Sequence, residues 1–331
     1  MKIEYDEVQK KQYIIDEDDS ININTIIEKE NVHIIIKSSH HYSEGKSGIS
    51  INNKDVTLEM RFEKQHTYNE FIKHYLRILD MLSFMTYRRN IGFDNIFLRN
   101  EKNNINVLLD YAEVRIHENE QRTQKHYFNN IPFEIISDNI SQFLDILYNV
   151  KDNKPSYNFG FIPEKDKNVF LYSPIRIKEI CSALECELSF LEDPNKLENK
   201  SLLELKNKIK EIIKDYKKEN KEISDDTYQT IYGSMAYWTQ PLSDRICTLY
   251  HKYQAEIINM LPNNSLISDN DIKAFVKYRN DITHGRHRIL TQRLAETAYI
   301  LCGVIYCSFL SRIGVENETI LDLCKNRMIL L

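Results

Sequence analysis

The sequence predicts two domains, an α+β N-terminal domain over residues 1–155 followed by an all-α helical bundle over residues 165–331. Three observations support this fold class. Short segments rich in Ile and Val fill much of the first half, whereas apolar residues recur at helical spacing through most of the second half. The polar segment 151–168 contains Pro155, Gly160 and Pro163, and we expect the domain linker there. The length of 331 residues fits two domains of roughly 150 residues each.

The first domain is expected to combine strands with two amphipathic helices. Apolar residues recur at i, i+3 and i+4 in Tyr68–Thr86, and Ile140–Val150 repeats this pattern. The strand candidates are bounded by Asn, Asp, Gly or Ser, which favour turns. The predicted strands are Tyr13–Asp16, Asn31–Lys37, Asp55–Phe62, Ile91–Leu98 and Ile105–Tyr111.

The second domain is expected to be almost entirely helical, with helix breakers between its apolar segments. Pro194, Pro241, Pro262 and Gly285 are these breakers, and Ser268-Asp269 supplies N-cap chemistry. The pair Asp225-Asp226 is interpreted as part of a turn or cap. The predicted helices are Ser173–Glu192, Lys200–Asn220, Leu242–Leu261, Asp269–Thr283 and Ile289–Ile313, with a short helix near Glu318–Asn326.

The composition excludes several classes of protein. None of the 8 glycines lies in a G-x-G string, so a dinucleotide fingerprint or a complete phosphate loop cannot be built. None of the 6 cysteines has C-x-x-C spacing, which favours free thiols in a reducing cytoplasm over a zinc site. The longest apolar run, Ala298 to Leu310, is too short to cross a bilayer. We therefore expect a cytoplasmic protein with no membrane segment, metal or other cofactor.

The net charge of −5 argues against a nucleic-acid partner, but the charge is unevenly distributed. Residues 1–160 hold 20 Lys and Arg against 25 Asp and Glu, whereas residues 161–331 hold 24 of each. The segment from Val276 to Arg293 is locally basic, which is typical of a surface that contacts phosphate. Its charged residues are Lys277, Arg279, Arg286, Arg288 and Arg293, against Asp281 alone.

One motif carries candidate chemistry, the R-x4-H string Arg279-Asn280-Asp281-Ile282-Thr283-His284, followed by Gly285. The pattern alone is weak, since Arg61 and His66 also match it, and we interpret that second match as coincidence. Context distinguishes the two. Arg279 lies near the end of the helix predicted from Asp269, Gly285 is the left-handed residue expected to terminate that helix, and a long apolar helix follows.

This arrangement resembles HEPN domains, whose R-x4-6-H motif has a polar residue after the Arg and precedes the final long helix. The segment IRIKEICSALECELSFLE, including the glutamate of S-A-L-E, resembles the first HEPN helix. The order of a mixed domain followed by a HEPN domain is similar to the ApeA-like group of bacterial anti-phage proteins. The resemblance implies a HEPN-like helical RNase domain and an N-terminal sensing or regulatory domain.

The resemblance further implies a metal-independent endoribonuclease that acts by abortive infection. Arg279, His284 and Asn280 are the expected catalytic residues, in a composite site of a homodimer or higher oligomer. His284 would exchange protons with the ribose 2′-OH and the leaving oxygen, Arg279 would stabilise the phosphate, and Asn280 would orient either group. Lys277, Arg286 and Arg288 are expected to bind RNA, for which tRNA is one candidate, and a phage-derived trigger is a further expected partner. The alternative is a catalytically inactive HEPN-type module for RNA or nucleotide binding or for oligomerisation.

Overall fold

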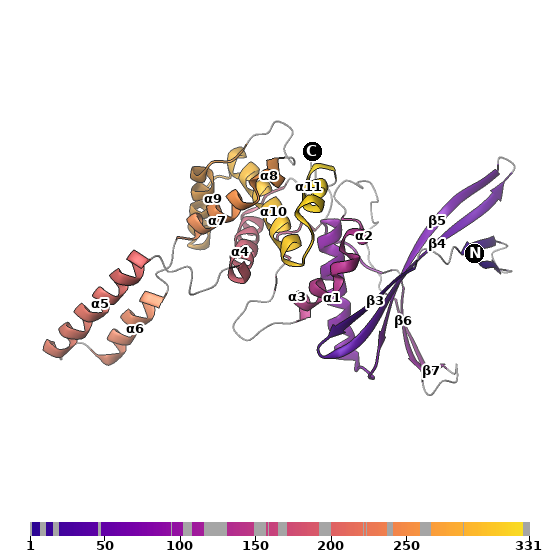
Figure 1. Ribbon diagram of the computed structural model, residues 1–331, viewed down its shortest axis with the longest axis horizontal. Helices are drawn as coiled ribbons and strands as arrows, with labels where there is room; N and C mark the ends of the chain where they lie inside the picture. Colours follow the sequence, from indigo (N-terminus) through magenta and orange to yellow (C-terminus); the bar gives the residue numbers. More distant parts are fainter. Residues whose placement is uncertain are drawn as a thin grey trace. The chain divides into compact units, whose positions relative to one another are not determined.

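The computed structural model describes residues 2–326, with gaps at 7–10, 16–19, 46–47, 94, 102–107, 116–130, 149–156, 158, 165–170, 192–199, 221, 223, 237–240, 259–265 and 287. An antiparallel sheet near the N-terminus precedes a mostly helical region (Figure 1). The chain forms two compact units. The first comprises Met1–Ser156, Glu164–Asp166 and Ser311–Thr319, and the second comprises Tyr157–Pro163, Lys167–Leu310 and Ile320–Leu331.

The sheet of the first unit is centred on the long strand β4 (Glu30–Gly45). Strand β5 (Gly48–Phe62) pairs with β4 along its length, and β3 (Ile21–Ile27) pairs with the first half of β4. The hairpin of β1 (Lys2–Asp6) and β2 (Lys11–Ile15) joins β4 at His40 and His41. Every pairing is antiparallel.

The predicted strands coincide only partly with this sheet. The three predicted strands that begin at Tyr13, Asn31 and Asp55 overlap β2, β4 and β5, whereas β1 and β3 were not predicted. The two predicted strands that begin at Ile91 and Ile105 overlap a separate hairpin, β6 (Asn95–Glu101) with β7 (Leu108–Arg115).

The helices of the first unit cover one face of the sheet. Helix α1 (Tyr68–Thr86) has the predicted bounds, because Thr67 and Glu70 form a capping box at its start and Tyr87 adopts the left-handed conformation at its end. The short helices α2 (Phe133–Ile136) and η3 (Ser137–Asn139) lead into α3 (Ile140–Tyr148). The fully buried Phe84 of α1 packs edge-on against Phe143 of α3, with 5.5 Å between the ring centroids.

Four helices of the second unit lie together in Figure 1. They are α4 (Pro174–Leu191), α7 (Leu242–Lys252), α9 (Asp269–Thr283) and α10 (Gln292–Arg312). Helix α10 is central, since every residue from Thr297 to Leu310 is buried. The predicted helix Leu242–Leu261 is wrong in extent, because α7 ends at Lys252 and the short α8 (Gln254–Ile257) follows.

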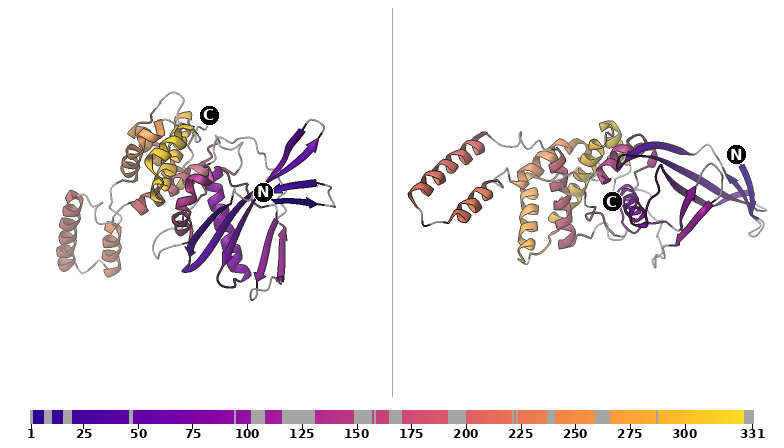
Figure 2. Two further views of the ribbon diagram at one scale, coloured as in Figure 1. Left: turned by 45° about the vertical axis from the view of Figure 1, so that its right-hand side comes forward. Right: turned by 90° about the horizontal axis from the view of Figure 1, so that it is seen from below.

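Two more helices, α5 (Lys200–Glu219) and α6 (Asp225–Ala236), run antiparallel to each other, as Figure 2 shows. Asp225 and Asp226 form the first turn of α6, so of the two alternatives, a turn or a cap, the structure favours a position at a helix start. Acidic side chains in a first turn interact favourably with the helix dipole, which explains their position. The chain also contains α11 (Asn317–Asn326), close to the predicted last helix.

Helix α10 is the one described helix that is long and apolar enough to cross a membrane. Within its apolar window, 78% of the residues are buried inside the structure. The core helix of a globular bundle has this combination of apolar composition and burial.

Candidate functional site

Helix α9 carries the R-x4-H motif, and both of its ends are fixed by local hydrogen bonds. At its start, the Ser268 side chain accepts from the Asp271 amide and the Asp271 carboxylate accepts from the Ser268 amide. At its end, Gly285 has a φ of +73°. The amide of Gly285 donates to the Ile282 carbonyl, and the amide of the next residue donates to the Asp281 carbonyl at 2.9 Å. These two bonds make a Schellman motif, so the prediction that Gly285 terminates the helix in the left-handed region is confirmed.

A stripe of exposed polar residues runs along α9 to its C-terminal end. Lys273, Lys277, Asn280 and His284 are spaced four, three and four residues apart, and all four are exposed. This spacing places them on one face of a helix with 3.6 residues per turn. We call these four residues the α9 stripe.

Arg279 lies beside the α9 stripe and is held by two neighbours. Its guanidinium forms an ion pair with Glu185 of α4 and donates from Nη1 to the Asn280 side-chain oxygen at 3.1 Å. The side chain of Arg279 is 21% exposed. Burial acts to lower the pKa of Arg279, but Glu185 and Cys181 outweigh it, so the pKa is raised above its usual value. Arg279 is therefore charged and oriented, and still reachable from solvent.

The Arg279 side chain lines an open groove of about 470 Å³ between three helices. Helix α9 contributes Lys273, Lys277 and Asn280, and α4 contributes Glu185. The remaining residues are Val276, from α9, and Pro241, Leu242 and Ser243 at the start of α7. Three cations against one carboxylate give the groove a net positive lining, which suits an anionic ligand.

His284 occupies the C-cap position of α9 and does not line the groove. Its backbone amide donates to the Asn280 carbonyl at 3.1 Å, which fixes the residue through the main chain. The imidazole is exposed and makes no hydrogen bond or ion pair with any residue that the structure describes. The side chain is therefore open to a ligand. The structure thus joins Arg279 to Asn280 by a hydrogen bond, and Asn280 to His284 by their shared helix face.

Arg286 and Arg288, expected to bind RNA, converge on one buried carboxylate. Asp281 accepts from Arg286 Nη1 at 3.1 Å and from Arg288 Nε at 2.8 Å, while its own side chain is only 6% exposed. Burial acts to raise the pKa of Asp281, but the two guanidiniums outweigh it and lower the pKa. Both arginines hold the segment after α9 against the helix end, and each keeps about half or more of its surface exposed.

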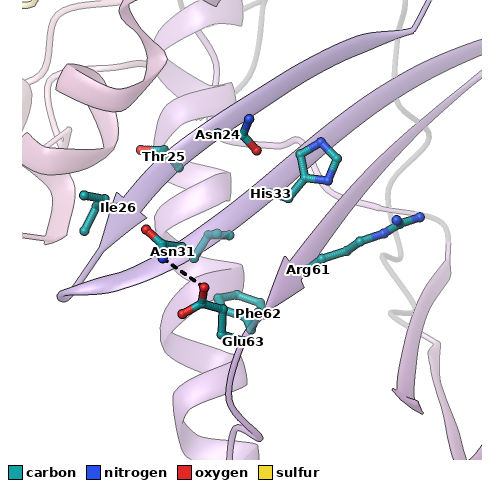
Figure 3. Close-up of a pocket in the computed structure, with 9 residues that line it drawn as sticks. Asn24, Thr25, Ile26, Asn31, His33, Arg61, Phe62 and Glu63 are labelled. Atoms are coloured by element: carbon teal, nitrogen blue, oxygen red, sulfur yellow. Dashed lines mark hydrogen bonds between the residues drawn. The ribbon is translucent and has the colours of Figure 1, made fainter. Parts of the chain in front are cut away.

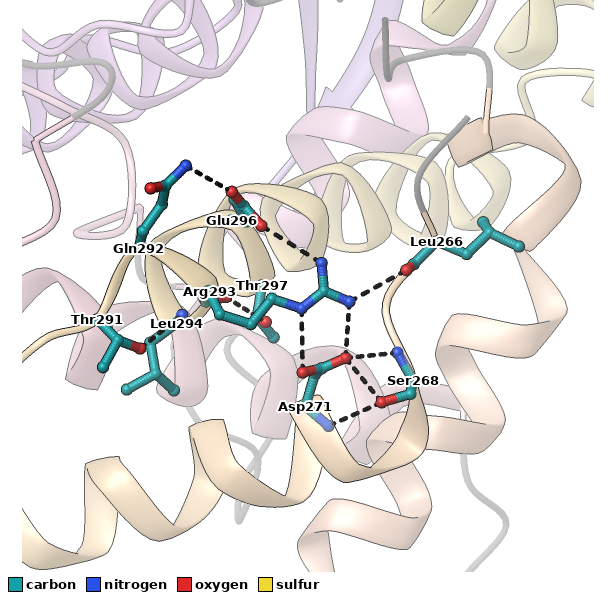
Figure 4. Close-up of polar contacts among 9 residues, drawn as sticks. All are labelled: Leu266, Ser268, Asp271, Thr291, Gln292, Arg293, Leu294, Glu296 and Thr297. Carbon is teal, nitrogen blue, oxygen red and sulfur yellow. Dashed lines mark hydrogen bonds and ion pairs between the residues drawn. The ribbon is translucent and has the colours of Figure 1, made fainter. Parts of the chain in front are cut away.

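Arg293, part of the basic segment in the sequence, belongs to a separate network shown in Figure 4. Its guanidinium donates to both carboxylate oxygens of Asp271, to Glu296 and to the Leu266 carbonyl. Hydrogen bonds from Arg293 lower the pKa of Asp271 far below its usual range, although burial opposes them. Arg293 therefore ties the start of α10 to the start of α9. Its charge balances Asp271 and Glu296 instead of adding to the groove.

Two of the charged residues that line the groove, Glu185 and Lys273, were not selected as site residues from the sequence. Glu185 is the glutamate of the S-A-L-E string, but its partner is 94 positions away, so spacing offered no signal for this contact. Lys273 did leave a signal, because it precedes the selected Lys277 by one helical turn.

A second open groove, of about 480 Å³, lies on the first unit (Figure 3). It follows the row Asn24, His33 and Arg61, which are register neighbours on β3, β4 and β5. Within the described residues, no group of three or more His, Cys, Asp or Glu side chains could hold a metal ion.

In comparisons with protein-family models, with curated proteins and with solved structures, no match was found for this chain.

Proposed function

We propose that the protein is a metal-independent endoribonuclease of the HEPN type that acts in bacterial anti-phage defence by abortive infection. One observation carries the proposal. An exposed histidine, His284, shares a helix face with Asn280, whose side chain is hydrogen-bonded to Arg279 at the wall of a cationic groove. An exposed imidazole, one helical turn from the asparagine that holds an oriented guanidinium, is suited to proton transfer at a phosphate ester.

The proposed reaction uses the 2′-OH of the RNA itself as the nucleophile. His284 exchanges protons with the 2′-OH and the leaving oxygen, as histidine does in general acid–base catalysis. Arg279 stabilises the charge that develops on the phosphate, and its fork geometry suits two phosphate oxygens at once. The products are a 2′,3′-cyclic phosphate and a 5′-OH end. DNA lacks the 2′-OH and is not a substrate in this proposal.

A single Arg and a single His are few groups for this reaction, and we propose that a homodimer supplies two copies of the motif. A two-fold axis presents the same surface patch from each subunit, so two α9 stripes would face one another. The first unit would then sense a phage-derived trigger and control the nuclease. The RNA target, with tRNA as one candidate, is part of the same proposal.

The test is to incubate the purified protein with total RNA, with and without a metal chelator, and to map the cut ends. We expect cleavage with chelator present and cyclic-phosphate ends. His284→Ala should reduce cleavage by about 10²–10⁴-fold, the usual contribution of a general acid or base. The matched control is His251→Ala, which removes another exposed histidine, one that is hydrogen-bonded to Asp269. Equal cleavage by the wild type and the His284 variant would refute the proposal.

A non-catalytic module for binding RNA or nucleotides is the second candidate. It is favoured by the ion pair between Arg279 and Glu185, because a guanidinium held by a carboxylate is less available to a reacting phosphate. RNA binding without cleavage of any RNA by the wild type would support this second candidate over the first.

A further inference from the structure

The groove beside Arg279 continues past the motif along α9. Its lining includes Lys277 and Lys273, and these lie two and six residues before Arg279. At 1.5 Å of rise per residue, Lys273 is displaced from Arg279 by about 9 Å along the helix axis. A groove of this length exceeds what one phosphate group fills.

The cationic side of this extension has little local neutralisation. Lys277 forms no ion pair with any residue that the structure describes. Lys273 forms a long ion pair with Asp244, at 3.9 Å, and both side chains are about half exposed. An exposed ion pair of this kind contributes little free energy, so an anionic ligand can compete with Asp244 for Lys273.

The opposite wall is the first turn of α7. Pro241 occupies the N-cap and provides no side-chain hydrogen bond to the helix. The carbonyl of Pro241 accepts from the amides of Asp244 and Arg245, so the intrahelical bonds begin there. The amides of Leu242 and Ser243 precede that first bond, and both residues line the groove opposite the two lysines. A helix start adds positive potential to the groove, whose α9 wall carries the two lysines, while the carboxylate of Asp244 in the same first turn of α7 opposes it.

We propose that this extension is a second phosphate subsite, in which Lys273, Lys277 and the start of α7 bind a backbone phosphate next to the one held at Arg279. The ligand class is a single-stranded RNA backbone. The subsite rests on the proposed function for its substrate, and it assigns Lys273 and Ser243, which the motif does not include. Its contribution is to bind and position the strand, with no part in the chemical step.

The experiment measures binding separately from cleavage. The probe is a short single-stranded RNA methylated at every 2′-oxygen, which the proposed reaction cannot cut. Its affinity for the full-length protein is measured over a series of salt concentrations, for the wild type and for Lys273→Ala/Lys277→Ala. The matched control is Lys210→Ala/Lys214→Ala, which removes two exposed lysines at the same four-residue spacing on α5.

We expect weaker binding by the α9 double variant and a shallower salt dependence. Each lysine that neutralises a phosphate of a single strand contributes about 0.7 to the slope of log K against log salt. The slope should therefore fall by about 0.7 for each lysine lost, while the α5 control keeps the wild-type slope. On unmodified RNA, the α9 double variant should have a higher KM and an unchanged kcat, because the lysines bind the strand without taking part in the chemical step.

The outcomes separate the subsite from the nuclease. A wild-type slope in the α9 double variant, or an equal loss in the α5 control, would overturn the subsite. Failure of the wild-type protein to bind the methylated RNA would overturn it as well. Binding that depends on Lys273 and Lys277, in a protein that cuts no unmodified RNA, would support the subsite and refute the nuclease.

Discussion

The chain contains two Arg and His pairs with the same spacing, and the structure gives them different surroundings. Arg61 lies on β5, and Figure 3 shows its side chain extending from the strand. It is exposed and forms an ion pair with Glu59. Arg279 is largely covered and pairs across helices with Glu185. The two arginines therefore differ in how firmly the fold holds them.

For the two histidines the order is reversed, because His66 is held by neighbouring side chains and His284 by none that the structure describes. His66 bonds through Nε2 to Glu30 at 3.0 Å and through Nδ1 to His74 at 3.3 Å, and His74 bonds to the Tyr148 hydroxyl at 2.8 Å. With both histidines neutral, the Tyr148 hydroxyl donates to His74, His74 donates to His66, and His66 donates to the Glu30 carboxylate. Both nitrogens of His66 are thus engaged in joining strand, loop and helices, whereas the His284 ring is open to solvent. Identical spacing yields a structural link in one unit and a candidate site in the other.

Among the tests of this comparison, the largest effect is expected from replacing the two arginines separately. Arg279→Ala should lower RNA cleavage by about 10²–10³-fold, the usual cost of removing one group that stabilises transition-state charge. Arg61→Ala, an exposed surface change, should leave cleavage within about twofold. Initial cleavage rates of the two variants on one RNA provide the measurement. Equal losses would show that the spacing, and not its surroundings, matters.

A smaller effect is expected from the glycine that follows His284. Gly285→Ala places a side chain at a φ of +73°, although nothing lies within 4 Å of the new Cβ. The strain of the left-handed conformation should destabilise the last turn of α9 by about 1 kcal/mol. The control is Gly233→Ala in the interior of α6, which also meets nothing within 4 Å. It should instead stabilise its helix by about 0.5–1 kcal/mol.

Residue-resolved hydrogen exchange measures both helices in the same experiment. Faster exchange at the end of α9 in the first variant and slower exchange in α6 in the second are expected. A neutral or stabilising Gly285→Ala would contradict the role given to the Schellman motif.

The smallest effect is a pH dependence that belongs to the first unit. Burial lowers the pKa of His74 below its usual value of 6.5, and the neighbouring His66 lowers it further, with Lys73 acting in the same direction. Glu28 and Glu30 oppose this. Below about pH 6.5 the unfolded chain therefore binds a proton that the folded unit does not readily accept, so stability falls as pH falls.

Hydrogen exchange of α1 and α3 at about pH 7.5 and about pH 5.5, corrected for the intrinsic exchange rate, measures this effect. The opening free energy of these helices should be lower at the acidic pH. His74→Asn removes the titrating group and should flatten the dependence. An equal dependence in this variant would assign it to other groups.

The sequence predicted those features of α9 that depend on local chemistry. Ser268 and Gly285 indicated its two ends because capping and the left-handed glycine need only a few neighbouring residues. The partner of Arg279 required knowledge of how α4 packs on α9, and no local pattern contains that. Asp281 left a signal that was not used, since it follows the buried Tyr278 by three residues and so lies toward the core.

The errors in the fold have similar causes. In β3 the sequence ININTII alternates isoleucine with asparagine, and only the frequency of asparagine in turns argued against a strand. At Tyr253 the break between α7 and α8 occurs without proline or glycine, so the apolar periodicity continued through it.

Asp281 has a consequence for how mutagenesis of this region must be interpreted. Its carboxylate holds Arg286 and Arg288, and its carbonyl accepts the amide that closes the helix end. A substitution at this one position would release two guanidiniums and alter the local charge at once, without Asp281 itself meeting any ligand. An alanine scan would then credit a buried residue with effects that arise from its two arginine neighbours, unless each arginine is also varied alone.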